Sequence, residues 1–355
     1  MTESRYTIRR HACPRNCYDA CGILSYVEKG VLKKISGDPR HGFSRSCLCP
    51  KAYSYVQQVY SPERLLYPLR QYPRGSGNWQ RVSWEEVLEQ IAGQILQLKE
   101  CYGNTLAVAL NKYSGNFGLL HNAVESFFSS LGDTTRAIGS PCWSAGLDAL
   151  KYDFGSPRCP DPEDLSCSRL IVLWGVNPVW NSMHSWHFIQ QAKERGGLVV
   201  CVDPLLSATA ARADLYLRVR PGTDGALALG AIRCLVDEGL LNEDLLVRRT
   251  CGWPELKKYL LEQVTVAWAS AETGVAEEDI RQLARLLVSR CPAAIWVGFG
   301  LQRYRQGGQT VRTINALAAA AGQLGRRGAG IYYAHNDTWQ FNFFTRGAGT
   351  GPYPA

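Results

Sequence analysis

Five cysteines within the first fifty residues have a spacing that could hold a metal centre. In chain order they are Cys13, Cys17, Cys21, Cys47 and Cys49. The first three recur at intervals of four residues, and one chain reversal could bring a distant fourth thiol beside them. Three closely spaced cysteines with one remote ligand are typical of iron–sulfur clusters. The pattern therefore predicts a cluster held by four thiolates.

The fourth ligand could be either of the two later cysteines. With Cys49 the motif reads C-x3-C-x3-C-x27-C, and with Cys47 the last gap becomes x25. We favour Cys49, because Pro50 stops the chain there and Lys51 puts a cation next to the ligand. The alternatives are a chance spacing or a zinc site, although zinc more often takes its thiolates from pairs of C-x2-C.

The elements around the cysteines can be predicted from turn and capping patterns. Residues 22–36 are expected to form two short strands around a glycine turn, which would return the chain toward the first three cysteines. Ser83 followed by Glu86 is a capping-box pattern and predicts a helix that begins there. A buried strand, a polar loop and a helix are expected at residues 106–110, 111–118 and 119–131.

Two apolar strands farther along flank a helix of about a dozen residues. The strands are Leu170–Trp174 and Leu198–Val202, a spacing typical of a βαβ unit with parallel strands. Ligands of such sheets bind at the carboxyl ends of the strands. The candidate contacts at these ends are Gly175, Asn177 and Asp203.

Two later segments repeat this arrangement. After a strand at 215–219, residues 220–225 open a helix that Thr223 or Asp224 could cap, and its free N–H groups could face an anion. A plain capped turn is the alternative. Residues 242–290 are expected to be helical. A second strand–glycine–helix module follows. Its strand is expected at 293–297, its glycine turn at Gly298 and Gly300, and its helix at 307–324. No GxGxxG motif is present, so ordinary NAD binding is disfavoured.

The composition is that of an ordinary globular protein. The chain has 355 residues, 46% hydrophobic and 20% charged, which allows two or three domains. Its thirteen cysteines are an odd number in a long chain, which disfavours a disulfide scaffold and suits a reducing compartment. The net charge of +8 suits a phosphate-bearing cofactor or an acidic redox partner. Basic runs are absent, so nucleic-acid binding is disfavoured.

The sequence gives no sign of export or membrane insertion. Arg9-Arg10 precedes the first cysteine without a following apolar run, so neither a secretory nor a twin-arginine signal is expected. No stretch approaches the roughly 20 apolar residues that a membrane span needs. The expected location is therefore cytoplasmic.

Together these motifs resemble the molybdopterin oxidoreductase family, of the dimethyl sulfoxide reductase type whose members bind two molybdopterin guanine dinucleotides. The likeness runs from Cys13 to about Gly330. Its most specific parts are the cysteine motif with Gly37-Asp38-Pro39 and Cys49-Pro50-Lys51, then Asp203-Pro204, then Arg220-Pro221-Gly222-Thr223-Asp224. The resemblance implies an α/β fold, with a small N-terminal 4Fe-4S domain followed by Rossmann-like α/β domains with mainly parallel sheets.

The resemblance also assigns roles to residues. The cluster ligands would be Cys13, Cys17, Cys21 and Cys49, with Lys51 between cluster and pterin to help relay electrons. One dinucleotide would contact Gly175, Asn177, Asp203, Thr223 and Asp224. A second dinucleotide would lie against Gly298 and Gly300. Molybdenum or tungsten would be held by the dithiolenes of the pterins.

A protein ligand to that metal is expected from the loop around Cys142. A soft thiolate suits a metal already bound by sulfur. Ser140 or Ser144 could supply an alkoxide instead, or Cys142 could be a small buried hydrophobe. His184 and His187 could assist proton transfer, or they could be packed or solvent-facing histidines.

The domains expected from the resemblance are an iron–sulfur domain, a first α/β domain and a second, dinucleotide-binding α/β domain. The iron–sulfur domain would comprise residues 1–60. The first α/β domain would comprise 61–138 together with 291–355, and the second would comprise 139–290. Family members are considerably longer than this chain. It is therefore expected to be an N-terminal half-length member, through truncation or a partial reading frame, without the family's C-terminal barrel-like domain.

The implied function is that of a molybdenum or tungsten oxidoreductase catalytic subunit. It would carry out two-electron oxygen-atom or hydride-equivalent transfer on a small-molecule substrate, with electrons relayed through the 4Fe-4S cluster. An iron–sulfur electron-transfer subunit and a role in anaerobic respiration are also implied. The alternative is a non-catalytic iron–sulfur electron-transfer or cofactor-scaffold protein left from such an enzyme. Formate, thiosulfate, polysulfide, sulfoxide and nitrate are not distinguished as substrates.

Overall fold

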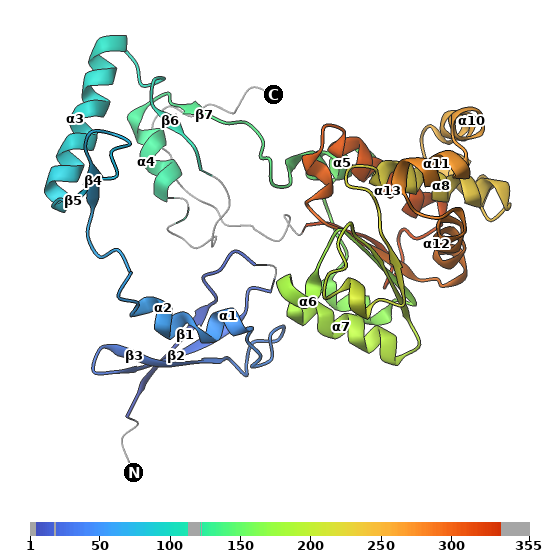
Figure 1. Ribbon diagram of the computed structural model, residues 1–355, viewed down its shortest axis with the longest axis horizontal. Helices are drawn as coiled ribbons and strands as arrows, with labels where there is room; N and C mark the ends of the chain where they lie inside the picture. Colours follow the sequence, from blue (N-terminus) through green and yellow to red (C-terminus); the bar gives the residue numbers. More distant parts are fainter. Residues whose placement is uncertain (1–4, 18, 113–120, 122, 335–355) are drawn as a thin grey trace. The chain divides into compact units, whose positions relative to one another are not determined.

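The computed structural model describes residues 5–17, 19–112, 121 and 123–334. The chain separates after Ile138 into two compact units, each with its own packing. Figure 1 labels β1 to β7 and most of the helices.

The N-terminal unit begins with a three-stranded antiparallel sheet. Its strands, in order, are β1 (Thr7–Ala12), β2 (Gly22–Glu28) and β3 (Val31–Gly37). Lys29 and Gly30 both adopt positive φ, 48° and 79°, in the turn between β2 and β3. Two positive φ angles match the right-handed twist of a hairpin. The predicted hairpin is therefore confirmed, and β1 adds a strand to it.

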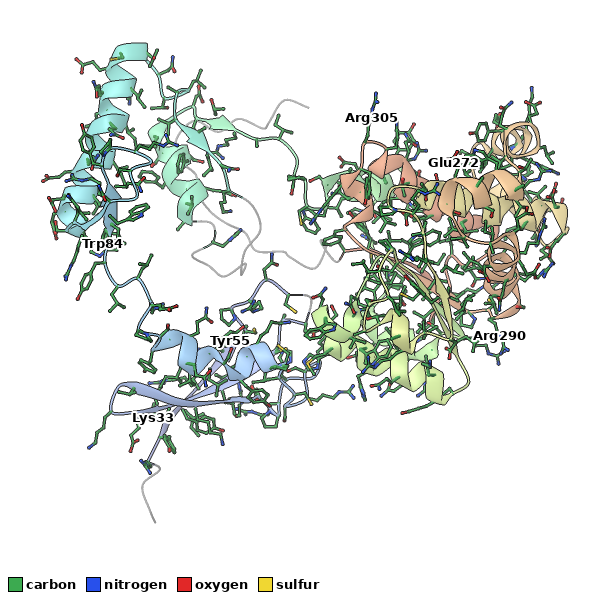
Figure 2. The ribbon with its side chains drawn as sticks, viewed as in Figure 1. Lys33, Tyr55, Trp84, Glu272, Arg290 and Arg305 are labelled. Carbon is green, nitrogen blue, oxygen red and sulfur yellow. The ribbon has the colours of Figure 1, made fainter. Side chains whose placement is uncertain are left out.

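Two short helices close over this sheet. They are α1 (Pro50–Tyr53) and α2 (Tyr55–Val59), and both contact β3. Tyr55, which Figure 2 labels on α2, is buried in a small core with Cys21 and Ile23 of the sheet. This core fixes the helices that follow Cys49 against the strands that follow Cys21.

The rest of this unit has less buried structure. The short strands β4 (Leu69–Gln71) and β5 (Trp79–Arg81) pair antiparallel, and α3 (Trp84–Tyr102) follows. The predicted capping box is confirmed: Ser83 Oγ accepts the Glu86 N–H at 3.1 Å, and the Glu86 carboxylate accepts the Ser83 N–H at 2.8 Å. Within the described part of the chain, α3 buries none of its side chains.

A parallel pair of very short strands follows α3. They are β6 (Ala109–Leu110) and β7 (Thr135–Arg136), with α4 (Ala123–Leu131) between them in the sequence. The strand predicted here is too long, because only its last two residues pair and Leu106 is 52% exposed. Residues 113–118 of the predicted loop lie outside the described residues.

The second unit is built on a five-stranded parallel sheet with the strand order β10-β9-β8-β11-β12. The strands are β8 (Leu170–Trp174), β9 (Leu198–Val202), β10 (Leu215–Leu217), β11 (Ala293–Val297) and β12 (Gly330–Tyr332). β8, β9 and β11 have the predicted bounds. The predicted α/β fold with parallel strands is confirmed.

Helices cover both faces of this sheet (Figure 1). One side carries α5 (Ser144–Phe154), α8 (Asp224–Asp237) and α13 (Gly307–Ala320). The other side carries α6 (Pro178–Asn181) and α7 (Met183–Glu194). The predicted helical region between α8 and β11 consists of α9 (Glu243–Arg249), α10 (Trp253–Gln263), α11 (Val266–Thr273) and α12 (Glu277–Ser289).

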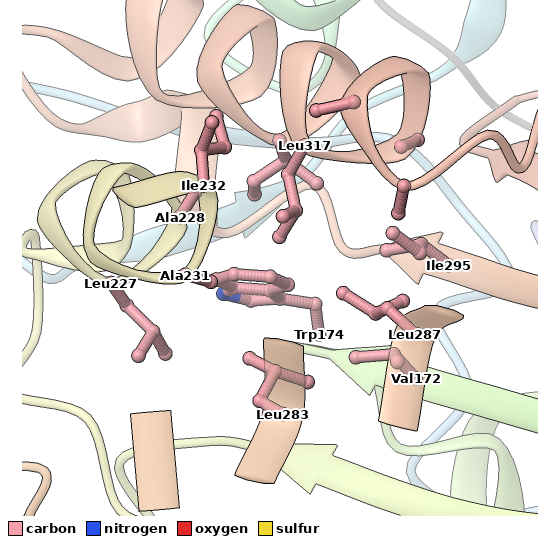
Figure 3. Packing of buried hydrophobic residues seen from close by; sticks show 14 of the residues in the cluster. Val172, Trp174, Leu227, Ala228, Ala231, Ile232, Leu283, Leu287, Ile295 and Leu317 are labelled. Atoms are coloured by element: carbon pink, nitrogen blue, oxygen red, sulfur yellow. The ribbon is translucent and has the colours of Figure 1, made fainter. Parts of the chain in front are cut away.

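β8 lies at the centre of the sheet and is buried on both faces. Its side chains alternate, and the main core receives Leu170, Val172 and Trp174. The opposite face receives Ile171 and Leu173, each no more than 1% exposed. Figure 3 shows Trp174 beside Ala228 and Ala231 of α8. A strand covered on both faces is a continuous apolar run in the sequence, which is why β8 could be predicted from the sequence.

β11 lies beside β8 along its whole length, from Ala293 opposite Leu170 to Val297 opposite Trp174. This pairing differs from the predicted domain division, which grouped 291–355 with the first α/β domain. The physical reason is that every side chain of β11 is buried, so the strand needs cover on both faces. Its place between β8 and β12 pairs both of its edges and puts its faces under the helices that cover the sheet. The boundary predicted at residue 60 stays a prediction.

Candidate functional site

The predicted cluster ligands lie at the ends of the first strands and helix. Cys13 follows β1, Cys21 precedes β2, and the Cys13 N–H donates to the Cys21 carbonyl at 2.8 Å. Cys17 lies in the loop closed by that bond. Cys49 is the residue immediately before α1. The sheet and the helix thus bring the early and late cysteines into one region.

The segment before Cys49 is held by a close backbone approach. A Cβ atom on Gly37 would lie 2.1 Å from the Ser46 carbonyl oxygen, so only glycine fits at the end of β3. Asp38 is buried, and its carbonyl accepts the Ser46 N–H at 3.3 Å. The Gly37-Asp38 pair therefore fixes the loop that carries the last cysteines.

The electrostatics of the four thiols show that they lie close together. The pKa of Cys21 is raised to about 12, mainly by burial and in smaller part by the charges of Asp19, Cys13, Cys17 and Cys49. Burial also raises the pKa of Cys17, with a contribution from Cys49 and an opposite one from Lys51. Four mutually repelling thiolates need a strong positive charge among them, and an iron cluster supplies it. This donor set fits a 4Fe-4S cluster.

The remaining candidates near the thiols have different surroundings. Cys47 is exposed, whereas Cys49 is half-buried and is among the groups that raise the pKa of Cys17 and Cys21; the choice of Cys49 stays a prediction. Lys51 is half-buried in α1. Tyr55 was not predicted: its hydroxyl lies 3.2 Å from Cys13 Sγ. Burial, then this contact, raise the pKa of Tyr55 to about 12. No local pattern marks Tyr55, because its contact depends on how α2 packs.

The second group of candidates lies at the carboxyl edge of the parallel sheet. The strand order reverses direction between β8 and β11, and such a switch point is where ligands bind in open α/β sheets. Gly175 follows β8 and Gly298 follows β11. A Cβ atom on Gly298 would lie 2.0 Å from the Gly175 carbonyl oxygen. The structure thus brings the two predicted glycine turns into direct contact.

The polar candidates on the β8 and β9 side are partly exposed. The Thr209 hydroxyl donates to Asn177 Oδ1. Asp203 accepts the Leu205 N–H at 2.8 Å through one carboxylate oxygen. Burial raises the pKa of the Asp203 carboxyl. Asp203 is therefore a half-buried acceptor at the switch-point edge, a position that suits a ribose hydroxyl or a guanine N–H.

The two candidates that open α8 differ from expectation. Thr223 stands directly before the helix, but its hydroxyl donates to the Arg220 carbonyl at 2.7 Å and makes no capping bond. Asp224 is buried, and its carboxylate accepts the Trp174 indole N–H at 2.8 Å. Neither side chain caps the helix as predicted: the Thr223 hydroxyl is turned toward the Arg220 carbonyl, and the Asp224 carboxylate is turned toward Trp174. Their contact with a dinucleotide stays a prediction.

Cys142 lies beside a cavity of about 530 Å³. The cavity is lined by Ser140, Pro141, Cys142, Ala145, Gln302 and Arg303. Ser140 Oγ accepts the Cys142 N–H at 3.0 Å, and Ser144 is the first residue of α5. Gln302 and Arg303 were not predicted, although only Leu301 separates them from the predicted Gly298–Gly300 turn.

The two histidine candidates lie on α7. His184 is buried, whereas His187 is exposed and its ring nitrogen lies 3.0 Å from the Gln191 amide nitrogen. Their roles stay predictions. In the described part of the chain, no helix is both long enough and apolar enough to cross a membrane.

Comparison with known proteins agrees with this arrangement. The sequence model of the molybdopterin oxidoreductase Fe4S4 domain matches residues 7–61, and that of molybdopterin oxidoreductase matches residues 64–348. The chain is 34% identical over 328 residues to the "Probable oxidoreductase YyaE" of Bacillus subtilis, covering 92% of this chain and 48% of that protein. It is 29% identical to "Dimethyl sulfoxide reductase DmsA" of Escherichia coli, covering 92% of this chain and 45% of that protein.

A solved structure shares the fold. "Acetylene Hydratase from Pelobacter acetylenicus" superposes with a TM-score of 0.72 at 22% identity, over 90% of this chain and 44% of that one. The chain thus spans about half the length of the curated relatives it matches. Because the matched family models cover nearly all of the chain, it belongs to the molybdopterin oxidoreductase family, with an N-terminal Fe4S4 domain.

Proposed function

We propose that the chain forms the iron–sulfur and cofactor-binding part of a molybdenum or tungsten oxidoreductase catalytic subunit. The observation that carries the proposal is the convergence of four cysteine thiols from two separate segments of the chain. A structural zinc site would use the same donors but would leave the glycine turns of the parallel sheet without a role. The relatives named as oxidoreductases support the redox assignment.

The N-terminal residues would bind the iron–sulfur cluster. Its ligands would be Cys13, Cys17, Cys21 and Cys49. Lys51 would place a positive charge beside them, as its lowering effect on the pKa of Cys17 already indicates. Tyr55 would orient Cys13 through its hydroxyl.

The second unit would bind one or two molybdopterin guanine dinucleotides. Asp203 would accept hydrogen bonds from a ribose or guanine edge, and Gly175 and Asn177 would line the same turn. Thr223 and Asp224 would contact the same dinucleotide at the start of α8. Gly298 and Gly300 would lie against the other one, and the Cys142 thiolate would bind the metal.

The cofactors supply chemistry that side chains lack. When bound, the metal pterin supplies two-electron oxygen-atom or hydride-equivalent transfer and the 4Fe-4S cluster supplies one-electron transfer. The protein orients these groups and tunes their charge. An excess of basic residues, 39 against 31 acidic, supports an acidic iron–sulfur subunit as the electron partner. We place the protein in the cytoplasm, in anaerobic respiration on a small-molecule substrate.

Metal content per chain tests the proposal. The protein is purified without oxygen from a host that makes the pterin cofactor, and iron, molybdenum, tungsten and zinc are measured together. About four irons with close to one molybdenum or tungsten is the expected result. Iron without molybdenum or tungsten would contradict the proposal and indicate a non-catalytic electron-transfer protein. Zinc without visible absorbance would contradict it and indicate a zinc-stabilised module.

A further inference from the structure

Gln302 makes two hydrogen bonds that bracket Cys142. Its Oε1 accepts the Ala145 N–H at 2.9 Å, and its Nε2 donates to the Pro141 carbonyl at 2.8 Å. Gln302 is only 5% exposed, so its amide has little access to bulk water as an alternative partner. One amide therefore fixes a peptide group on each side of the cysteine.

The same loop is held from a second direction. The Tyr333 hydroxyl donates to the Trp143 carbonyl at 3.0 Å. A Cβ atom on Gly146 would lie 2.1 Å from that hydroxyl oxygen, so the loop packs closely against Tyr333. The peptide groups around Cys142 are thus bonded to distant segments, while its side chain stays beside the cavity.

Gln302 itself belongs to the switch-point edge of the sheet. It is the middle residue of a 3-10 turn, Leu301–Arg303, that directly follows the Gly298–Gly300 segment. A Cβ atom on Gly175 would lie 2.2 Å from Leu301 Cδ1, so this turn also touches the first glycine turn. A displacement of either glycine turn would move Gln302, and with it the Cys142 loop.

We propose that Gln302 is a positioning residue that holds the Cys142 thiol at the cavity and couples its loop to the switch-point turns. The inference rests on the proposed function, in which Cys142 binds the metal. A neutral amide is required, because it donates and accepts at once. A carboxylate would lose the donor toward Pro141, and a thioether would lose both bonds.

Gln323 provides a matched control. It is 2% exposed; its Oε1 accepts the Ala293 N–H at 2.8 Å, and its Nε2 donates to the carbonyls of Leu287 and Ala321 at 2.9 and 2.7 Å. Ala293 begins β11, so Gln323 lies at the opposite end of that strand from the switch point. Replacing either glutamine removes buried amide bonds, but only Gln302 contacts the Cys142 loop.

The test compares Gln302→Met with Gln323→Met in the full chain purified without metal. Cys142 alkylation by iodoacetamide is followed by peptide mass spectrometry, with the exposed Cys101 as internal reference. Losing two hydrogen bonds from a loop shifts its opening equilibrium by roughly tenfold. We expect the Cys142 rate to rise by about that factor in Gln302→Met and to stay within about twofold of wild type in Gln323→Met.

Two results would overturn the inference. One is an unchanged rate of Cys142 alkylation in Gln302→Met. The other is an equal rise of that rate in both variants, which would mean that either substitution destabilises the whole domain. If Gln302→Met does not fold, Gln302→Glu replaces it, with a smaller rise expected because the acceptor toward Ala145 remains. The alkylation rate does not depend on bound metal. Wild-type protein without molybdenum or tungsten would therefore refute the proposed function and leave this measurement standing.

Discussion

The indole N–H of Trp174 donates a hydrogen bond of 2.8 Å to the carboxylate of Asp224. Trp174 ends β8 and is fully buried, and Asp224 is the first residue of α8. The bond joins the centre of the sheet to a helix N-terminus, where the helix dipole favours a negative charge. The turn before α8 is therefore anchored from inside the core.

The first prediction concerns the pH dependence of stability. Burial raises the pKa of Asp224 above its ordinary value of 3.8, although the Trp174 bond opposes the shift. The folded state then binds a proton more tightly than the unfolded state, so stability is fully present below the unfolded pKa and is lost as pH rises through the folded pKa. Asp224→Asn removes the titration. The free energy of unfolding of this variant minus that of wild type, both measured in urea, should increase from about pH 4 to pH 7.

Trp174→Phe is the companion variant. It leaves the carboxylate buried without its donor, which costs about 1–3 kcal/mol. Its deficit relative to wild type should grow as pH rises, because the ionised carboxylate needs the donor most. Curves for both variants that run parallel to wild type across this range would show that Asp224 does not titrate on folding.

The strands of the parallel sheet could be predicted because each is a short apolar run between turn residues. β8, β9 and β11 are buried almost throughout, so their sequences lack alternation and stand out from the helices. The glycine turns could be predicted for the same reason, since they follow the strands directly. Periodicity does not give the order of the strands in a sheet. For this reason the predicted domain division grouped β11 with the wrong part of the chain.

The parts of the site that escaped prediction depend on long-range contacts. Gln302 bonds to a loop more than 150 positions away, so no local pattern marks its role, although it lies just after the predicted Gly298–Gly300 turn. Asp224 was expected to cap α8 or to contact a dinucleotide, but its side chain turns inward, where the buried Trp174 indole is a donor. The cysteine motif was predictable because ligand spacing is local except for the last thiol. The choice between Cys47 and Cys49 stays a prediction.

Iron binding separates the two candidates for the fourth ligand. Cys49→Ala should lose most of the iron and acid-labile sulfide that reconstitution under anaerobic conditions gives wild type, because a four-thiolate site then lacks a donor. Cys47→Ala should retain them, since Cys47 is exposed and outside the group of interacting thiols. The reverse pattern would assign the ligand to Cys47 and require the chain around α1 to rearrange.

Lys51 should tune the reduction potential of the cluster. Burial raises the pKa of Cys17, and the Lys51 charge opposes this rise; the same positive field stabilises an added electron. Lys51→Met should lower the midpoint potential on the order of tens of millivolts, measured by a redox titration of the reconstituted protein. Lys33→Met, an exposed site on β3 labelled in Figure 2, is the control and should leave the potential unchanged. Equal potentials in all three proteins would remove Lys51 from the electron path.

The contact between the glycine turns can be tested by adding one methyl group. In Gly298→Ala the new carbon would lie 2.0 Å from the Gly175 carbonyl oxygen, so the backbone must shift at a cost of about 1–3 kcal/mol. Gly300→Ala is the control, because its Cβ would meet open space. Urea unfolding of the metal-free chain should show a loss only in the first variant. Equal stability of the two variants would mean that the turns separate readily, and that the switch-point edge is assembled only when a ligand binds there.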